Sequence, residues 1–468
     1  MCRSIRYHAR MDEVDILIVG GGLVGSSLAI ALDRSGLRVA LAEAAAPKLD
    51  QQPSYDERNL ALARASVNAL AALGVWDKVA AKATPIRRLH VSRRGEFGAA
   101  RFDAAAHGLD AFGATLPARE LGNGLLARLD ACGELLRLAP ASLKALEFVG
   151  DAAVAMLATA SGERRLRTRL VVGADGTQSF VRRTAGIQTD NVDYAQTAFV
   201  ATVTPQRATE GCAYERFTAT GPVAVLPLGE RRAGVVLTVP TDDAPRAAAL
   251  DDGGFIELLH ERFGYRLGRL SRLGKRVSYP LARVMAQRLV APRAVLVGNA
   301  AQTIHPIGAQ GFNLGLRDAL TLAEMLIEQR GDPGDVALLA RYAAQRREDR
   351  EGTAAMSDGL ARWTADESWP LKLARSFGLV ALDRIAPLQD AFVRRGMGFR
   401  ANAPLLALND LLLSPKQRLG ERLGEGETAR RVSPRAGFSA KSPPHPTLSP
   451  DSVGGEGFDS SRSLRGDA

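Results

Sequence analysis

The chain has 468 residues, a hydrophobic content of 46% and a formal net charge of +10 at pH 7, which suit a globular core in one large domain or two joined ones. Its three cysteines lie far apart without a CxxC spacing, which excludes a disulfide framework and a zinc site and indicates a reducing compartment. No Lys/Arg run is interleaved with aromatic residues and no window holds about 20 uninterrupted apolar residues, so neither nucleic-acid binding nor a membrane span is predicted.

The chain begins with the pattern of a βαβ unit. Residues 14–19 are apolar except for Asp15 and predict a short buried strand, residues 25–35 predict a helix, and residues 37–43 predict a second strand. A later apolar segment, 166–174, predicts another strand that ends at a turn. Strands that alternate with helices are typical of a parallel sheet covered by helices.

The middle and end of the chain have different patterns. The segments "GPVAVLPLGE" and "RRAGVVLTVP" predict two antiparallel strands around a Gly-Glu-Arg turn. Residues 294–297 predict a buried strand followed by a helix from about Phe312, and the pattern from 335 to 423 is mainly helical. The last residues are rich in Ser, Pro and Gly, so they cannot bury enough apolar surface to offset their ordering entropy.

The first strand runs directly into "GGGLVG", in which Gly20, Gly22 and Gly25 have the GxGxxG spacing. Gly20 permits a tight turn, Gly22 lets the backbone approach a pyrophosphate, and Gly25 lets the helix pack closely on the strand. Glu43 lies 21 residues after Gly22, at the end of the second strand, where a carboxylate can accept hydrogen bonds from both ribose hydroxyls. These features together predict a dinucleotide site, whereas a purely structural glycine-rich turn would not predict Glu43.

Two further turns carry candidate ligand contacts. In "VVGADGTQSFVRR" a strand runs into Asp175 and Gly176, which by themselves indicate an ordinary Asp-Gly turn more than a site. In "VLVGNAAQTIHPIGAQGFNLGLRD" a strand meets a run of small residues that starts at Gly298 and Asn299. Such a loop beside a helix N-terminus suits a close approach of backbone amides to a ligand.

The three motifs in this order resemble those of the class A FAD-dependent aromatic hydroxylases, the para-hydroxybenzoate hydroxylase-like flavoproteins, over about residues 12–400. The segments "SYDERNLALARASVNALAALGVW" and "YERFTATGPVAVLPLGE", with the third motif, are similar to the hydroxylases of ubiquinone biosynthesis, most of all to the 2-octaprenyl-6-methoxyphenol hydroxylase branch. That branch is marked by the Asn and Gln of Gly-Asn-Ala-Ala-Gln at 298–302, where the wider family has Gly-Asp-Ala-Ala-His. Asn299 can still hydrogen-bond a ribitol hydroxyl, and the missing charge should favour the anionic reduced flavin.

The resemblance also implies roles for single residues. Arg58 matches a pattern near the isoalloxazine ring, and Arg119 begins a helix that touches FAD; a surface ion pair and a solvated helix position are the respective alternatives. His305 and Pro306 are expected to position groups near the flavin, with a structural role as the alternative for His305. Asn313 could equally cap the following helix. The expected cofactor contacts are Gly20, Gly22, Gly25, Glu43, Arg58, Arg119, Asp175, Gly176, Gly298, Asn299, Gly308, Gly311 and Asn313.

The fold expected from pattern and resemblance together is α/β: a Rossmann-like FAD-binding domain with an inserted antiparallel-sheet substrate domain and a helical C-terminal region. Its expected parts are a disordered extension (1–11), the first part of the FAD-binding domain (12–185), the substrate-binding sheet (186–285), the flavin loop and helix (286–335), the helical region (336–423) and a disordered tail (424–468).

The resemblance implies a flavin monooxygenase that uses FAD, NAD(P)H and O₂ to hydroxylate a polyprenylated phenol through a flavin C4a-hydroperoxide. Hydroxylation of a small soluble aromatic compound, or a non-catalytic prenyl-lipid escort protein on the same fold, are the alternatives. We expect a cytoplasmic protein, peripheral on the inner face of the cytoplasmic membrane, and a complex with other ubiquinone-biosynthesis proteins. No metal site and no nucleic-acid partner are expected.

A candidate membrane-facing segment follows Asp383. It combines apolar residues such as Phe392, Met397 and Phe399 with basic residues such as Arg394 and Arg400. Apolar residues beside basic ones suit an interfacial helix on anionic lipid. A helix packed on the flavin domain with a solvated basic face is the alternative.

Overall fold

The computed structural model describes residues 12–46, 58–229, 231–399 and 403–408. The predicted N-terminal extension and the predicted tail lie outside these ranges. Among the described residues, helices and two large sheets are arranged as an α/β fold, which confirms the predicted class.

The first large sheet has five parallel strands in the spatial order β19, β11, β1, β2, β8. The strands are β1 (Asp12–Val19), β2 (Val39–Ala42), β8 (Leu136–Leu138), β11 (Gly162–Gly173) and β19 (Ala294–Leu296). Ile16, Leu17 and Ile18 are fully buried because helices cover the sheet, which is why the second half of β1 is a continuous apolar run. The first half of β11 also pairs with β10 (Ala152–Thr159), which pairs with β9 (Ala141–Val149).

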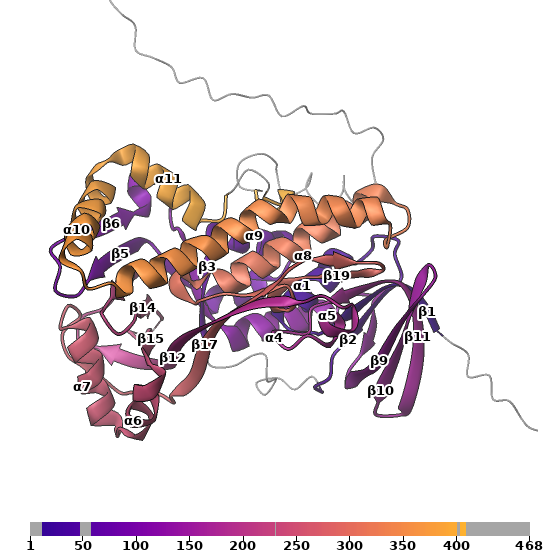
Figure 1. Ribbon diagram of the computed structural model, residues 1–468, viewed down its shortest axis with the longest axis horizontal. Helices are drawn as coiled ribbons and strands as arrows, with labels where there is room; N and C mark the ends of the chain where they lie inside the picture. Colours follow the sequence, from indigo (N-terminus) through magenta and orange to yellow (C-terminus); the bar gives the residue numbers. More distant parts are fainter. Residues whose placement is uncertain (1–11, 47–57, 230, 400–402, 409–468) are drawn as a thin grey trace, which may run out of the picture. The chain divides into compact units, whose positions relative to one another are not determined.

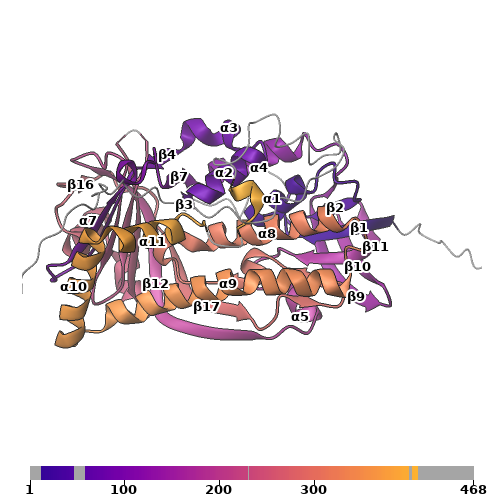
Figure 2. The ribbon, with the colours of Figure 1, turned by 90° about the horizontal axis from the view of Figure 1, so that it is seen from above.

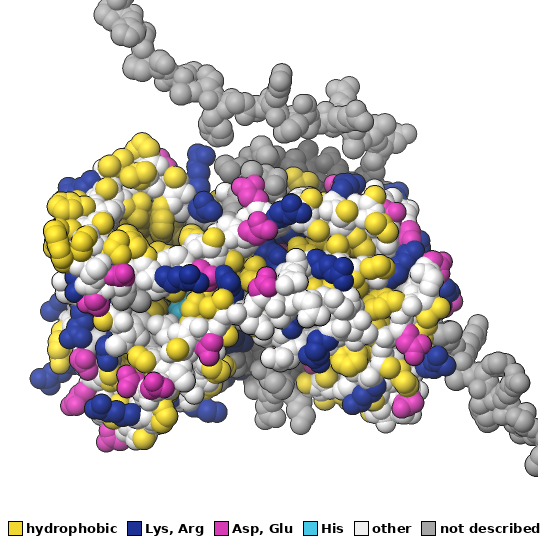
Figure 3. Space-filling view, in the orientation of Figure 1, with side chains coloured by type: hydrophobic (Ala, Val, Ile, Leu, Met, Phe, Trp, Pro, Cys, Tyr) yellow, Lys and Arg dark blue, Asp and Glu magenta, His cyan; other side chains and the backbone are white. Residues whose placement is uncertain are grey.

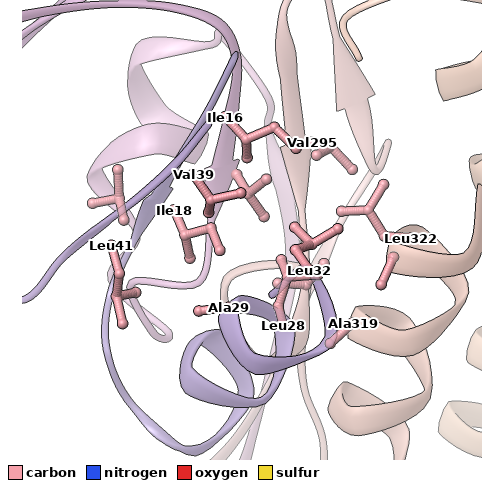
Figure 4. Packing of buried hydrophobic residues seen from close by; sticks show 14 of the residues in the cluster. Ile16, Ile18, Leu28, Ala29, Leu32, Val39, Leu41, Val295, Ala319 and Leu322 are labelled. Carbon is pink, nitrogen blue, oxygen red and sulfur yellow. The ribbon is translucent and has the colours of Figure 1, made fainter. Parts of the chain in front are cut away.

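The main core lies between this sheet and two helices that are far apart in sequence, α1 (Leu23–Ala31) and α8 (Gln310–Gln329). In Figure 4, Ile16 and Ile18 of β1 lie close to Leu28 and Leu32 of α1. Ala319 and Leu322 of α8 complete the same cluster, together with Val295 of β19. This packing brings the third motif, which joins β19 to α8, next to the first motif, which joins β1 to α1.

The second large sheet has nine strands, in the order β20, β17, β12, β15, β14, β13, β5, β6 with β16 beside β12. Its strands are β5 (Arg88–Arg93), β6 (Ala99–Asp103), β12 (Thr189–Pro205), β13 (Cys212–Phe217), β14 (Val223–Pro227), β15 (Ala233–Pro240), β16 (Leu270–Ser271), β17 (Val277–Ala286) and β20 (Gln302–Thr303). Helices α6 (Ala244–Ala249) and α7 (Asp252–Phe263) pack on one face, where Phe199 of β12 meets Phe255 of α7.

Two strands of the second sheet fall in a range that the sequence assigned to the FAD-binding domain. Residues 88–103 were placed in the range 12–185, but β5 pairs in parallel with β13, and β6 pairs with β5. A parallel partner needs a long crossover, and Cys212 comes 124 positions after its partner Arg88, so the local sequence gives no sign of the pairing. A third, small sheet is formed by strands that flank β5 and β6 in sequence: β3 (Asn59–Ala63), β4 (Thr84–Ile86) and β7 (Gly113–Pro117).

The C-terminal region is helical, as predicted, with α9 (Val336–Ala365), α10 (Trp369–Arg384) and α11 (Ala386–Gly396). Helix α9 runs beside α8 in both views (Figures 1 and 2). The expected membrane-facing segment is only partly exposed, because Met397 is buried against Phe102 and its neighbours. Arg400 lies outside the described ranges. None of the helices described here is long and apolar enough to cross a bilayer.

Buried charges tie α8 to α9. Asp318 of α8 is fully buried and accepts a hydrogen bond from Nε of Arg346 at 2.7 Å. Arg346 also donates to Asp349 at 2.7 Å, and Asp349 accepts from Nε of Arg317 at 2.7 Å. Burial alone would lower the pKa of Arg346, but the carboxylates of Asp318 and Asp349 raise it above its usual value. The network therefore stays charged and holds the two helices in one register.

We expect Asp318→Ala to lower the free energy of unfolding by about 3–5 kcal/mol, because it leaves a buried guanidinium with an incomplete set of acceptors. Arg38→Ala is the matched control: it breaks an ion pair to Asp15 in which the arginine is 61% exposed, and it should cost less than about 1 kcal/mol. Denaturant unfolding measures both values. Equal losses in the two variants would show that the network does not stabilise the fold.

Candidate active site

The glycine-rich turn after β1 is packed too tightly for side chains. Gly20 has φ +104°, and a Cβ there would lie 2.5 Å from the carbonyl oxygen of Ala174 at the end of β11. A Cβ on Gly25 would lie 1.9 Å from the carbonyl oxygen of Gly20. Gly22 is the N-cap residue of α1. The turn therefore presses the start of α1 against the sheet and leaves its N-terminal amides at the sheet edge, where they favour an anionic group.

Glu43 reaches this turn from the end of β2. Its Oε2 accepts a hydrogen bond from the amide of Gly21 at 2.6 Å, and its Oε1 accepts one from the amide of Ala45 at 2.9 Å. The side chain is only partly buried. A helix N-terminus for a pyrophosphate and a carboxylate for a ribose thus lie side by side, and this donor set fits the nucleotide half of a dinucleotide.

The carboxylate of Asp175 is used within its own turn. It accepts hydrogen bonds from Oγ of Ser179 at 2.5 Å and from the amide of Phe180 at 2.7 Å, and thereby caps the short helix α5 (Phe180–Thr184). Gly176 has φ +79° with open space around its Cα. The turn interpretation accounts for these contacts of Asp175, and a contact of either residue with a cofactor stays a prediction.

The second motif is joined to the third by Arg182, which the sequence did not single out as a contact. Its guanidinium is buried and donates to the carbonyl oxygens of Ala300 at 2.8 Å and Thr177 at 2.7 Å. The hydroxyls of Thr177 and Thr303 are 2.8 Å apart. The sequence shows only that Arg182 follows the capping residue Ser179 by three positions. It could not show the contact with the carbonyl oxygen of Ala300, which is 118 residues away.

In the third motif the two amide residues have different surroundings. Gly298, with φ +59°, lies so close to α1 that a Cβ would sit 3.1 Å from a methyl group of Val24. Asn299 is exposed and able to meet a ligand. Gln302 is buried, donates to Asp318 at 2.6 Å and accepts from Nε of Arg350 at 3.0 Å. Gln302 therefore belongs to the buried network rather than to the ligand-facing surface.

His305 holds the next part of the loop in place. Its side chain is fully buried, Nδ1 accepts from the amide of Ile307 at 3.3 Å, and Nε2 donates to Oε1 of Gln196 at 3.1 Å. Burial lowers the pKa of His305 to about 4, so the ring is neutral at neutral pH. Pro306 and Gly308, with φ +70°, are exposed just beyond it. These contacts suit a positioning role, which stays a prediction for the flavin itself.

Asn313 uses its amide inside the protein. Its Oδ1 accepts from the amide of Ala63 at 2.9 Å and from Oγ of Ser66 at 2.7 Å, and its Nδ2 donates to the carbonyl oxygens of Ala61 at 2.9 Å and Ala309 at 2.8 Å. The capping alternative is wrong, because the N-cap position of α8 is Ala309. The side chain instead ties the start of α8 to β3 and to α2 (Arg64–Ala72). Gly311, two residues earlier, has open space around it.

Arg58 and Arg119 are brought together by strand pairing. The amide of Ala118, which begins α4 (Ala118–Leu129), donates to the carbonyl oxygen of Arg58 at 2.8 Å. The guanidinium of Arg58 lies 5.5 Å above the ring of Tyr279 on β17, and that of Arg119 lies 3.6 Å from the carboxylate of Glu120. Both arginines thus lie where the small sheet meets the second large sheet, and their contact with FAD stays a prediction.

The second large sheet turns its two faces to different neighbours. The face under α7 is an apolar core, and a cavity of about 460 Å³ on that side contains none of the motif residues. The opposite face meets the loop and the small sheet: Gln196 holds His305, Tyr279 lies under Arg58, and a Cβ on Gly234 would lie 2.6 Å from Nδ2 of Asn59. This loop-facing face is in the position expected for the wall of a substrate pocket.

A carboxylate that sequence reasoning missed lies on the loop-facing face. Tyr214 of β13 packs on Phe263 of α7, so its neighbour Glu215 points to the opposite side, in register with Ala224 and Val91. Among the described residues, no side chain or amide hydrogen-bonds or ion-pairs with the carboxylate of Glu215. Burial raises the pKa of this carboxyl group to about 7. The sequence did contain an indication of this residue: Glu215 is a charged residue on the same strand face as the apolar Ala213 and Phe217.

Comparison with known proteins identifies relatives along most of the chain. The family described as FAD binding domain matches residues 13–356. The ubiquinone hydroxylase UbiL of Rhodospirillum rubrum is 39% identical over 391 residues, which are 83% of this chain and 90% of that protein. The 3-demethoxyubiquinol 3-hydroxylase of Escherichia coli is 34% identical over 83% of this chain and 99% of its own. The p-nitrophenol 4-monooxygenase PnpA of Pseudomonas putida shares the fold, with a TM-score of 0.69 and 20% identity over 83% of this chain and the whole of its own.

We expect Gly25→Ala to abolish FAD retention and to lower the melting temperature, because the added methyl group would overlap the Gly20 carbonyl oxygen and push α1 off the sheet. The visible absorbance of the purified protein measures bound flavin. Gly133→Ala is the control, since a Cβ there has no atom within 4 Å. Full flavin content in Gly25→Ala would refute this account of the turn.

Glu215→Gln should stabilise the protein only at higher pH. The pKa of Glu215 is raised to about 7 in the folded state, so the stability linked to its proton is present below about pH 4.5 and is lost as the pH rises through 7. The variant should match the parent near pH 4.5 and exceed it above pH 7 by about 1–3 kcal/mol. Thermal unfolding across this range is the measurement. The same difference in the exposed control Glu147→Gln would argue against a buried carboxyl.

Proposed function

The chain belongs to the FAD binding domain family, as an FAD-dependent aromatic-ring monooxygenase similar to ubiquinone-biosynthesis hydroxylases, and we propose that it hydroxylates a polyprenylated phenol on the route to ubiquinone. The observation that carries the proposal is 39% identity to UbiL over 83% of the chain. The ring position that the enzyme hydroxylates is the subject of the experiment below.

The residues that would hold FAD come from all three motifs. The amides at the start of α1 would face the pyrophosphate and Glu43 the ribose, while Asn299 and the backbone from Gly308 to Gly311 would lie along the ribitol and the flavin ring. FAD bound there supplies the transfer of one oxygen atom from O₂ to the ring, with electrons from NAD(P)H.

The protein's own part is to orient the phenol and to keep water away from it. On the loop-facing face of the second sheet, Ala213 and Leu226 pack with Ile86, and Glu215 lies two residues after Ala213 on the same face of β13. An ionised Glu215 can accept a hydrogen bond from the phenol hydroxyl at Oε1 or Oε2, which increases electron density on the ring. An apolar wall with one acceptor fits a phenol with a prenyl chain better than an aromatic acid, whose carboxylate would repel Glu215. The enzymatic relatives also speak against the non-catalytic escort alternative.

Expression of the chain in bacterial strains that each lack one ring-hydroxylation step of ubiquinone synthesis tests the proposal. We expect ubiquinone to return, measured by mass spectrometry, in the strain whose missing position this enzyme hydroxylates. The Gly25→Ala variant serves as the inactive control. Failure in every strain, together with NAD(P)H oxidation stimulated by water-soluble phenols, would replace the proposal with a small-molecule hydroxylase.

A further inference from the structure

Large apolar side chains are exposed together on the two helices that cover the β5–β6 end of the second sheet. Trp369 is 71% exposed and Phe377 is 63% exposed, both on α10, and Phe97 of the β5–β6 turn is 65% exposed. We call this surface the aromatic face; it consists of Phe97, Trp369, Leu373, Phe377, Ile385, Leu388 and Phe392. Hydrophobic side chains gather over α10 and α11 in Figure 3. Contiguous exposed apolar surface of this kind marks an interaction site.

The aromatic face is held firmly by the sheet beneath it. The rings of Phe97 and Phe377 meet edge to face with centroids 5.6 Å apart, and Phe392 stacks on the buried Phe102 at 5.0 Å. Arg375, on the inner side of α10, is buried and donates to Glu96 at 2.7 Å. The outward residues are therefore presented by a packed helix pair, so their exposure is a property of the fold.

Basic residues border the aromatic face. Arg384 is 75% exposed at the end of α10. At the other end, next to Trp369, a cavity of about 260 Å³ is lined by the cations Arg93, Arg94, Arg262 and Lys372 and by one carboxylate, Glu367. Arg93 and Lys372 both ion-pair with Glu367, and Arg94 and Arg262 both ion-pair with Glu261, so pairs of cations share single carboxylates and positive charge predominates. Aromatic side chains beside a cationic recess match the chemistry of an anionic lipid surface, with its acyl chains and phosphates.

We propose that the aromatic face docks on an anionic phospholipid bilayer, with Trp369 and Phe377 in the acyl boundary and a headgroup phosphate in the cationic cavity. The inference rests on the proposed function in one respect, because a polyprenyl substrate resides in the bilayer.

The inner side of the same helices leads towards the substrate wall. Leu379 and Leu382 of α10 pack against the same cluster around Phe102 as Val91 of β5, and Val91 is the register neighbour of Glu215. A prenyl chain that leaves the bilayer at the aromatic face would therefore cross one apolar layer before it reaches the loop-facing face of the sheet. Docking at this surface would therefore place the wall of the proposed pocket near the bilayer in which the substrate is dissolved.

Co-sedimentation of the FAD-loaded full chain with vesicles tests the proposal. We expect binding to vesicles of phosphatidylglycerol and phosphatidylcholine that falls at least tenfold in Trp369→Ala/Phe377→Ala. Lys372→Glu and added salt should also weaken it. Val336→Ala/Tyr265→Ala is the matched control, since it removes two side chains that are 74% and 66% exposed elsewhere. FAD content and melting temperature should stay constant in all variants.

No vesicle binding by the parent chain, or equal binding by the aromatic-face variant, would overturn the proposal. A dimer in analytical ultracentrifugation that Trp369→Ala/Phe377→Ala dissociates would identify a second copy as the occupant instead. Turnover of a water-soluble phenol shows that a variant is still active without a membrane. It therefore allows the docking surface to be tested separately from the proposed function. Restored ubiquinone without vesicle binding contradicts only the docking surface, whereas vesicle binding without restored ubiquinone contradicts only the substrate.

Discussion

The carboxylate of Asp318 is the contact on which the candidate active site depends most. It is fully buried, yet it receives hydrogen bonds from Arg346 on α9, from Gln302 and, at 3.3 Å, from the amide of Gly298. The last two groups belong to the loop that faces the cofactor site. A charge buried in this way is stable only when its partners are in place, so α8, α9 and the loop take up their positions together. The geometry of the loop at Gly298 then fixes its distance from α1 through Val24.

The contacts expected for the nucleotide and those expected for the substrate lie on different parts of the protein. The nucleotide end is built from backbone amides and Glu43, at the sheet edge where parallel strands end. The proposed substrate end is the loop-facing face of the second sheet, where Ala213 and Leu226 are apolar and Glu215 is a carboxylate. This division suits a flavoprotein, because the cofactor supplies the reactive chemistry and the chain has to supply orientation and exclusion of water.

The same helices that roof the substrate face also carry the exposed aromatic residues. Helix α10 is apolar on both sides: Leu379 faces the sheet and Phe377 faces outward. An exposed apolar helix face lowers the solubility of a protein. An interaction at that face would explain why it is exposed. Under the proposed function, the substrate would have to pass from the bilayer to its pocket, and this helix pair lies at the β5–β6 end of the second sheet.

The sequence by itself determined the parts that depend on local backbone geometry and on periodicity. Gly20 and Gly25 could be assigned because a turn between a strand and a helix leaves no room for a Cβ, and Glu43 followed from its place at the end of the next strand. The helical C-terminal region and the middle sheet followed from apolar periodicity. Only the tertiary structure decided the pairing of β5 with β13, the burial of Gln302 beside Asp318, and the ties from Asn313 to β3. It also decided that Glu215 faces the loop and that Phe377 faces outward. Each of these rests on partners tens to hundreds of residues away, and the local pattern of a strand or helix says that a face exists but not what packs against it.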